Sequence, residues 1–230
     1  MIILSADTST RYLAMGLTQV DHVLADVLLD CGRTHAERFL TSLNALLAQT
    51  SLSLKDVDAL AVTNGPGSFT GLRIAMSHFK GLACGLEKPL VAVPTLDALC
   101  RMHAFANQVV CPLMDAKMDE VFSAVYRFEG DTRSMIREPH ASSIADALHG
   151  LAPETVFFGD GAQRYTDEIR ALLPGAVILG ERHGVLHASA IAAEARALLE
   201  AGNSASPDDV HPVYLRKSQP EELRDKAASR

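Results

Sequence analysis

The chain has 230 residues, of which 48% are hydrophobic and 21% charged, and its formal net charge is −7. Low hydrophobicity combined with high charge marks disordered chains, so this composition predicts a folded protein with one large or two small lobes. It contains no apolar run of the roughly 18 residues that a membrane span needs, and its N-terminus shows no signal-peptide pattern, so we expect a cytoplasmic protein. The acidic balance argues against a protein that binds nucleic acid by itself, because such proteins present basic surface to the phosphates.

The first half of the chain predicts three strands, a helix, a fourth strand and a second helix. Short apolar runs over residues 2–6, 13–20 and 23–29 indicate the first strands, with a hairpin turn between the second and third. The first helix begins at Thr34, which forms a predicted capping box with Glu37. A strand over residues 59–63 and a helix over residues 70–85 follow. The apolar positions that indicate the first helix are Ala36, Phe39, Leu40, Leu43, Leu46 and Leu47.

The second half repeats this order. The strands are predicted over residues 109–114, 121–128, 134–137 and 155–158, and the helices over residues 142–148, 162–173 and 188–199. Gly202 follows the last helix as its C′ residue. The pattern β-β-β-α-β-α therefore occurs twice, which predicts an α/β fold of two similar lobes facing each other. The predicted lobes are residues 1–106 and 107–230, with a boundary near residues 104–108 and a charged, mobile tail.

Two loops are candidates for a phosphate site. The turn at residues 7–10 follows the first strand, where Asp7 could serve a phosphate or metal site, but it lacks the glycines that let a backbone approach phosphate closely, and an Asx turn is the favoured interpretation. The glycine-rich loop at residues 64–73 precedes a helix, whose N-terminal N–H groups and positive dipole end attract anions. Its alternative is a tight turn in which Ser68 or Thr70 caps the helix. Asp7, Gly67 and Ser68 are therefore weak candidates for cofactor binding.

The helix over residues 70–85 is apolar on two sides, so both sides must be buried. One seam consists of Leu72, Met76, Phe79, Ala83 and Leu86, and we expect it to pack on the sheet of its own lobe. The other side would then be exposed in a monomer, although a helix covered within the chain is the alternative. Small residues there allow close approach of a second helix, which predicts an association surface. Its predicted members are Gly71, Ile74, Ala75, His78, Gly81 and Leu82.

The sequence contains no pattern typical of a catalytic or metal centre. The four cysteines have no CxxC spacing, His35 has no histidine at metal-binding spacing, and HExxH and GxSxG are absent. Asp115, Asp119 and Glu120 cluster near a turn, where acid–base chemistry and ordinary solvated carboxylates are both open, the second being favoured. The sequence therefore predicts no catalytic residue and no metal ligand.

The motif GPGSFTGLR at residues 65–73 resembles the TsaB (YeaZ) family of bacterial tRNA threonylcarbamoyladenosine synthesis. Shorter matches support it at residues 7–9, 35–37, 80–83, 94–99 and 212–216, so that the resemblance covers nearly the whole chain. It implies an actin-like (ASKHA) fold of two lobes and no catalysis by the chain itself. Ala36 and Lys117 depart from the residues of many relatives, which carry Ser and Arg there.

The resemblance also implies a role and partners. The chain would assist the catalytic TsaD subunit and the ATPase TsaE, which together transfer a threonylcarbamoyl group from its adenylate to N6 of the adenosine next to the anticodon. We expect a homodimer when the chain is alone, contact with tRNA through the complex, no cofactor of its own, and ATP or ADP at the partner interface. The alternative is an independent actin-like ATPase or small-molecule kinase, suggested by Asp7 and the glycine-rich loop.

Overall fold

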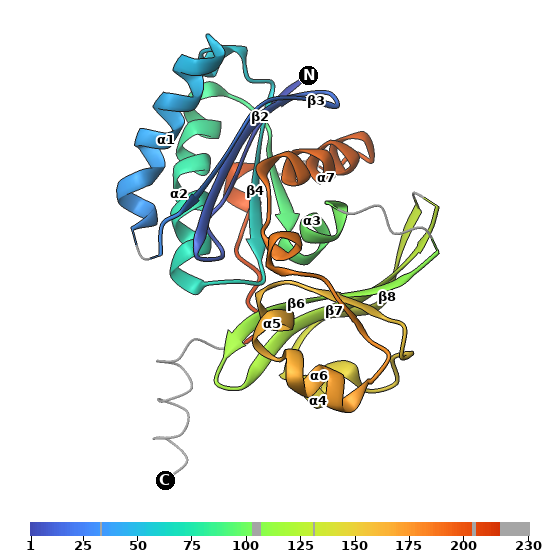
Figure 1. Ribbon diagram of the computed structural model, residues 1–230. Coiled ribbons are helices and arrows are strands. Elements are labelled where there is room, and N and C mark those ends of the chain that lie inside the picture. Colours follow the sequence, from blue (N-terminus) through green and yellow to red (C-terminus); the bar gives the residue numbers. More distant parts are fainter. Residues whose placement is uncertain (33, 103–106, 131, 204–205, 217–230) are drawn as a thin grey trace.

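The computed structural model describes the 230-residue chain except residues 33, 103–106, 131, 204–205 and 217–230 (Figure 1). Most of the predicted lobe boundary and the predicted charged tail after Arg216 lie outside the described residues. The described part forms two five-stranded sheets with helices between them and on their outer faces (Figure 1).

The N-terminal sheet has the strand order β3-β2-β1-β4-β5. Its strands are β1 (Ile2–Asp7), β2 (Tyr12–Gln19), β3 (His22–Asp30), β4 (Ala59–Gly65) and β5 (Leu90–Pro94). The first three strands are antiparallel, and β4 and β5 continue parallel to β1, with Ile3 opposite Ala59. The four predicted strands are confirmed. The sequence analysis predicts no strand at β5, because this strand has only five residues and lies between two helices.

Helices α1 (His35–Thr50) and α2 (Phe69–Leu86) cover the outer face of this sheet. The predicted capping box at Thr34 is wrong, because its hydroxyl donates to the Cys31 carbonyl over 2.9 Å and makes no cap bond. Leu40, predicted on the apolar stripe, is 54% exposed. The buried stripe of α1 follows Phe39, Leu43 and Leu46 at spacings of four and three, and one step of about 100° turns Leu40 to solvent.

The C-terminal sheet repeats the topology with the order β10-β9-β6-β7-β8. Its strands are β6 (Val109–Lys117), β7 (Glu120–Glu129), β8 (Thr132–Ser143), β9 (Val156–Phe158) and β10 (Val177–Ile178). Its outer face packs on α4 (Ile144–Leu148), α5 (Asp160–Arg164) and α6 (Thr166–Leu172). The single helix predicted over residues 162–173 is therefore divided, at Tyr165. Strand β8 has 12 residues and is much longer than the strand predicted over residues 134–137. The sequence signal is weak because this edge strand is largely polar and only partly buried.

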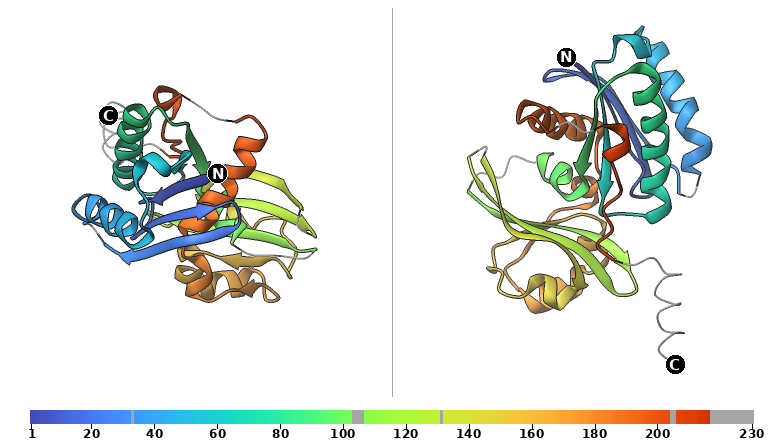
Figure 2. Two further views of the ribbon diagram at one scale, coloured as in Figure 1. Left: turned by 90° about the horizontal axis from the view of Figure 1, so that it is seen from above. Right: turned by 180° about the vertical axis from the view of Figure 1, so that it is seen from behind.

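Helices α3 (Thr95–Arg101) and α7 (Ala188–Glu200) lie between the two sheets (Figures 1 and 2). One continuous apolar core joins them to both inner faces, from Val91 and Val93 of one sheet to Phe128 and Phe158 of the other. Although α7 follows the C-terminal sheet along the chain, it packs on β1, β2 and β5 of the N-terminal sheet. Short 3-10 turns complete the fold at Leu54–Asp56, Glu181–Gly184 and Pro207–Asp209. Gly202 follows α7 with φ +80°, as predicted.

Asp26 of β3 caps the N-terminus of α7. Its carboxylate accepts the backbone N–H of Ala188 at 3.3 Å and that of Ser189 at 3.1 Å, as well as the Ser189 hydroxyl at 2.6 Å. The Ser5 hydroxyl donates to the Ala188 carbonyl over 2.7 Å, which adds a second bond from the sheet. A residue 162 positions away thus supplies the cap that the local sequence of α7 lacks.

We predict that Asp26→Ala lowers the free energy of unfolding by about 1–2 kcal/mol, because it removes the cap of a buried helix. Asp30→Ala is the matched control on the same strand. It breaks only the exposed pair with Arg11, so its expected cost is below about 0.5 kcal/mol. Urea unfolding followed by circular dichroism measures both, and equal losses would contradict the capping role of Asp26.

Candidate functional site

The turn after β1 is held by its own side chains. The Ser9 N–H donates to Asp7 Oδ1 over 3.0 Å, and the Tyr12 N–H donates to Thr10 Oγ1 over 3.1 Å. The Thr63 hydroxyl of β4 also donates to Asp7 Oδ1. The Asx-turn interpretation of this segment is therefore confirmed.

The glycine-rich loop packs directly against this turn. The Ser68 N–H donates to the Ser9 carbonyl over 2.7 Å, and a Cβ on Gly67 would lie 2.5 Å from the Ser9 Cβ. One helical turn later, Thr8 Oγ1 donates to the Gly71 carbonyl over 2.6 Å and accepts the Ala75 N–H at 3.1 Å. A Cβ on Gly71 would lie only 1.9 Å from the Thr8 carbonyl oxygen. The glycines therefore permit backbone-to-backbone contact between α2 and the β1 turn.

The structure brings the three weak cofactor candidates, Asp7, Gly67 and Ser68, together around Ser9. These three residues bond neighbouring groups rather than one another: Asp7 accepts from Ser9 and Thr63, and the Ser68 hydroxyl accepts the Gly71 N–H at 3.2 Å and so caps α2, one of the two predicted caps. A role for these residues in cofactor binding stays a prediction. The arrangement itself is that of a closed structural contact.

Asp7 is a buried carboxyl group with 1% exposure. Burial raises its pKa above the usual value, and hydrogen bonds from Ser9 and Thr63 oppose that shift. Among the described residues, Asp7 Oδ2 has no hydrogen-bond partner. Since an unpartnered buried oxygen is costly when charged, the neutral carboxyl is the form that this environment favours.

The corresponding turn of the C-terminal lobe is occupied by ion pairs. Asp115 binds Lys117 Nζ at 2.6 Å and Arg164 Nη1 at 3.0 Å. Although burial opposes it, hydrogen bonding to Lys117 holds the pKa of Asp115 below its usual value. Asp160 accepts the Asp115 N–H at 3.0 Å, and burial raises its pKa. The prediction of solvated carboxylates is therefore wrong for Asp115, because two cations bind it.

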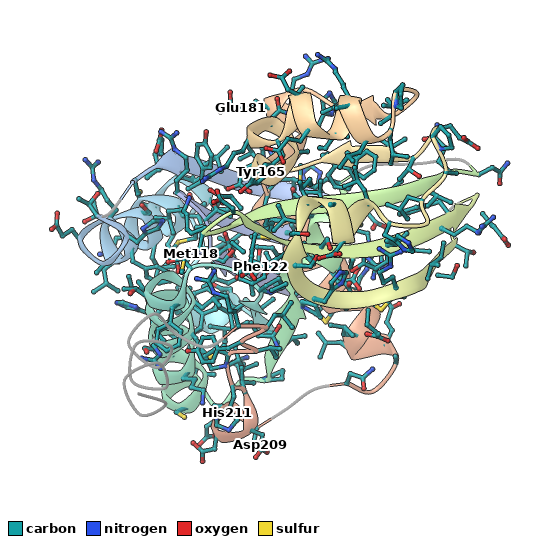
Figure 3. The ribbon with its side chains drawn as sticks, turned by 90° about the horizontal axis from the view of Figure 1, so that it is seen from below. Met118, Phe122, Tyr165, Glu181, Asp209 and His211 are labelled. Carbon is teal, nitrogen blue, oxygen red and sulfur yellow. The ribbon has the colours of Figure 1, made fainter. Side chains whose placement is uncertain are left out.

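The tip of this β6–β7 hairpin is left-handed at three successive residues, Lys117, Met118 and Asp119, with φ between 55° and 64°. Met118 is 51% exposed there, and the side chain of Asp119 is 92% exposed (Figure 3). Such conformations are uncommon for residues other than glycine, and the hairpin and its ion pairs hold them in place. Neither the composition nor the spacing of residues predicts these left-handed conformations.

A segment that we call the C-terminal strap, residues 210–216, runs along the start of α2 and reaches the β6–β7 hairpin (Figure 2, right). The Val213 N–H donates to the Asn64 carbonyl over 2.7 Å. The Tyr214 ring stacks on Phe69 with ring centres 4.3 Å apart. Arg73 lies 3.9 Å above the Phe69 ring and donates to the Tyr214 hydroxyl over 2.9 Å. The strap thereby fixes the outer edge of the glycine-rich loop.

The strap continues to the second lobe, where Arg216 pairs with Glu120 at 3.2 Å. Between the strap and α2 lies an open hollow of about 390 Å³. His211 and Asp209 lie close together at this end of the molecule (Figure 3). No local pattern in the sequence predicts the contact between the strap and α2, because Arg73 and Tyr214 are 141 positions apart. The hollow is lined by Arg73, Met76, Ser77, Lys80, His211, Pro212 and Tyr214.

The predicted association surface of α2 divides into buried and accessible positions. Gly71 packs against Thr8, and Ala75 is 1% exposed, so the expectation that these two are exposed is wrong. His78 stacks on Phe39 of α1 at 4.4 Å, so α1 covers part of this side. Ile74, His78 and Leu82 are half-buried, and Gly81 faces open space. The exposed side of α2 is therefore not the side that was predicted, although both include Gly81. Its exposed positions include Thr70, Arg73, Ser77, Gly81, Cys84 and Gly85.

Two sheets of the same strand order, facing each other across α3 and α7, define an α/β protein of two similar lobes. A family model described as TsaD, tRNA N6-adenosine threonylcarbamoyltransferase, matches residues 29–200. The tRNA threonylcarbamoyladenosine biosynthesis protein TsaB of Escherichia coli is 31% identical over 95% of this chain and 96% of its own length. The Bacillus subtilis protein of the same name is 28% identical over 66% of each chain.

Solved structures give the same result. A Pseudomonas aeruginosa protein with similarity to peptidase YeaZ has a TM-score of 0.81 at 27% identity, covering 94% of this chain and 99% of its own. YeaZ from Pseudomonas aeruginosa has a TM-score of 0.78 at 26% identity, covering 93% of this chain and 100% of its own. The chain belongs to the TsaB (YeaZ) family.

The described part of the chain holds no group of three or more His, Cys, Asp or Glu side chains that could bind a metal ion. It also holds no helix that is long and apolar enough to cross a membrane.

Gly71→Ala should destabilise the fold by about 2–4 kcal/mol, because its methyl group would overlap the Thr8 carbonyl, which is backbone and cannot rotate away. Gly81→Ala is the matched control on the same helix. It faces open space, so the better helix propensity of alanine should stabilise the protein by up to about 1 kcal/mol. Thermal unfolding of both variants tests the contact, and a Gly71→Ala variant as stable as the parent would refute it.

The raised pKa of Asp7 predicts a pH-dependent effect of Asp7→Asn. As the pH rises through the folded-state pKa, the parent must bury a charge and loses stability, whereas the variant does not. We expect the Tm of Asp7→Asn to rise relative to that of the parent as the pH rises above about 4, the ordinary pKa of an aspartate. Asp21→Asn is the control: Arg196 lowers the pKa of Asp21, so the contribution of this pair is lost only as the pH falls below about 4, and above that pH the Tm curve of Asp21→Asn should run parallel to that of the parent. Parallel Tm curves for Asp7→Asn and the parent would contradict the prediction.

Proposed function

We propose that this chain is a non-catalytic partner of a TsaD-type threonylcarbamoyltransferase and is required to form N6-threonylcarbamoyladenosine at the tRNA adenosine next to the anticodon. The observation that carries the proposal is the alignment with the Escherichia coli biosynthesis protein TsaB over 95% of the chain. The matching family model, which is described as the transferase itself, supports common ancestry with the catalytic subunit.

The turn after β1 is bonded to α2, which supports a partner role rather than independent catalysis. A kinase or ATPase of this fold needs an accessible turn after β1 for phosphate, and here the Ser9 carbonyl and the Thr8 hydroxyl are bonded to α2. The alternative of an independent ATPase or small-molecule kinase is therefore not favoured.

We infer that the exposed side of α2 is the association surface. Ser77, Gly81 and Cys84 repeat at spacings of four and three and are all exposed, with Gly85 beside them. A helix that presents small side chains in this way lets a second helix approach closely. The half-buried Ile74, His78 and Leu82, all from the predicted surface, lie at its margin. The surface would serve a homodimer when the chain is alone and the TsaD-type subunit when that is present.

The proposal includes further partners. A TsaE-type ATPase would join the complex, and tRNA would be reached through it, because a chain with net charge −7 gains little from phosphate neutralisation. ATP or ADP would bind at the interface with the partner rather than in this chain alone. Since the substrate is tRNA, we propose a cytoplasmic location.

Reconstitution tests the function. Purified TsaD-type and TsaE-type proteins are incubated with threonylcarbamoyl-adenylate and unmodified tRNA, with and without this chain, and modified adenosine is quantified by mass spectrometry. We expect product only in the complete mixture. Equal product without the chain, or robust ATP turnover by the chain alone, would overturn the proposal.

Gly81→Arg tests the association surface. A large charged side chain at this open position would hold a partner helix away and leave its charge unpaired, which should cost about 2 kcal/mol or more and weaken association roughly thirtyfold. Leu172→Arg is the control, because Leu172 is 50% exposed on α6 of the other lobe. Light scattering measures the homodimer, and calorimetry measures binding of the TsaD-type protein. If both variants associate like the parent, α2 is not the surface.

A further inference from the structure

A group of charged side chains is buried within the layer that joins the two lobes. We call it the interlobe ion cluster; its members are Asp97, Arg101, Arg133 and Glu194, together with the hydroxyl of Tyr126. Three of these charged side chains are largely buried, with Arg133, Asp97 and Glu194 only 16%, 15% and 6% exposed, whereas Arg101 lies at the edge and is 38% exposed. The cluster holds two cations and two carboxylates, so its charges balance.

Arg133 is the centre of the cluster. Its Nη2 lies 2.8 Å from Glu194 Oε1 and 3.3 Å from Asp97 Oδ2, and its Nη1 donates to the Asp97 carbonyl over 2.6 Å. The Tyr126 hydroxyl donates to Asp97 Oδ1 over 2.5 Å, and Arg101 Nε donates to Glu194 Oε2 over 2.9 Å. Each carboxylate is therefore bound on both of its oxygens.

The bonds of Arg133 and Tyr126 cross between the lobes. Arg133 and Tyr126 belong to β8 and β7 of the C-terminal sheet. Asp97 and Glu194 belong to α3 and α7, and α7 packs on the N-terminal sheet. The members of the cluster come from four separate elements, so no local sequence pattern indicates it.

The surrounding apolar core and the cluster constrain the lobes in different ways. Apolar contact is non-directional, so two sheets that face each other across α3 and α7 could slide or rotate slightly while keeping much of their buried area. A planar guanidinium bound to two carboxylates and a carbonyl has a fixed geometry, and displacing it leaves buried charges unpaired. Only one relative position of the lobes satisfies all these bonds.

We propose that the interlobe ion cluster is an orienting lock, which holds the C-terminal lobe in a single position against the N-terminal lobe. Two-lobed α/β proteins commonly change shape by hinge motion of one lobe against the other. The lock opposes that motion and makes the protein one rigid body. This inference concerns the chain by itself and is independent of the proposed function.

Distance measurements between spin labels test the lock in the full chain. Leu40 is 54% exposed on α1, so Leu40→Cys can carry one label, and Leu172→Cys on α6 provides the second, in a background with Cys31→Ser and Cys84→Ser. The main variant is the neutral triple Asp97→Asn/Arg133→Met/Glu194→Gln, which removes the charges together and leaves none of the three unpaired. Glu194→Gln alone is a milder variant that keeps the shape of the side chain.

The matched control is Arg137→Met on the same strand as Arg133. Arg137 is also an arginine that donates to carbonyls, those of Ala147 and His149 at 2.8 and 2.7 Å, but both lie within its own lobe. Its removal should leave the distance between the lobes unchanged.

We expect one narrow distance distribution for the parent and for Arg137→Met. In the neutral triple, the distribution should broaden roughly twofold or split into two populations, and in Glu194→Gln it should broaden less in the same sense. Circular dichroism establishes which variants are folded. If the folded variants of the cluster keep the distribution of the parent, the apolar core alone orients the lobes and the proposal is overturned. If Arg137→Met broadens it equally, the effect is not specific to the cluster and the proposal also fails.

Discussion

Both sheets bury their inner faces against the same two helices, α3 and α7, and the rest of the architecture depends on this shared apolar layer. The apolar face of a sheet must be buried, and here α3 and α7 together bury the inner faces of both sheets. Because α7 comes last along the chain yet packs on the first sheet, the N-terminal lobe is complete only after the C-terminal lobe has been made. The cap that Asp26 provides to α7 strengthens this dependence.

The shared layer also determines where the strand ends lie. The turn after β1 and the corresponding turn after β6 carry polar groups that bond other groups of the chain, although Asp7 Oδ2 and Ser9 Oγ have no hydrogen-bond partner among the described residues. Gly67 and Gly71 allow α2 to contact the β1 turn through backbone atoms, and Lys117 and Arg164 neutralise Asp115 in the other lobe. The glycine-rich motif therefore has a structural explanation here: it fixes the start of α2 against the sheet.

Fixing the start of α2 has a consequence for the outer surface. The side of α2 that carries Leu72, Met76 and Phe79 is buried, and α1 covers a second side through Phe39 and His78. What remains open is a narrow strip of small residues, bordered by the C-terminal strap. The same contacts that close the strand-end turn thus present this strip in a fixed position, so that its small residues are held at the surface of the N-terminal lobe.

The sequence by itself determined the elements whose signals are local. Apolar runs located β1 to β4, helical spacing located α2 with Ser68 or Thr70 as its cap, and the doubled pattern of strands and helices indicated two lobes of one class. Helix and turn signals depend on residues a few positions apart, so one sequence is enough to detect them. The motif at residues 65–73 likewise indicated the family.

The tertiary structure alone decided which of these features meet. The burial of Gly71 and Ala75, the pairing of Arg73 with Tyr214, the capping of α7 by Asp26 and the contact of Arg133 with Glu194 all join distant positions, up to 163 apart. Edge strands such as β8 and short strands such as β5 also lack a strong local pattern, because their stability comes from neighbouring strands. Such contacts form only when the whole chain packs, and no periodicity within a segment can specify them.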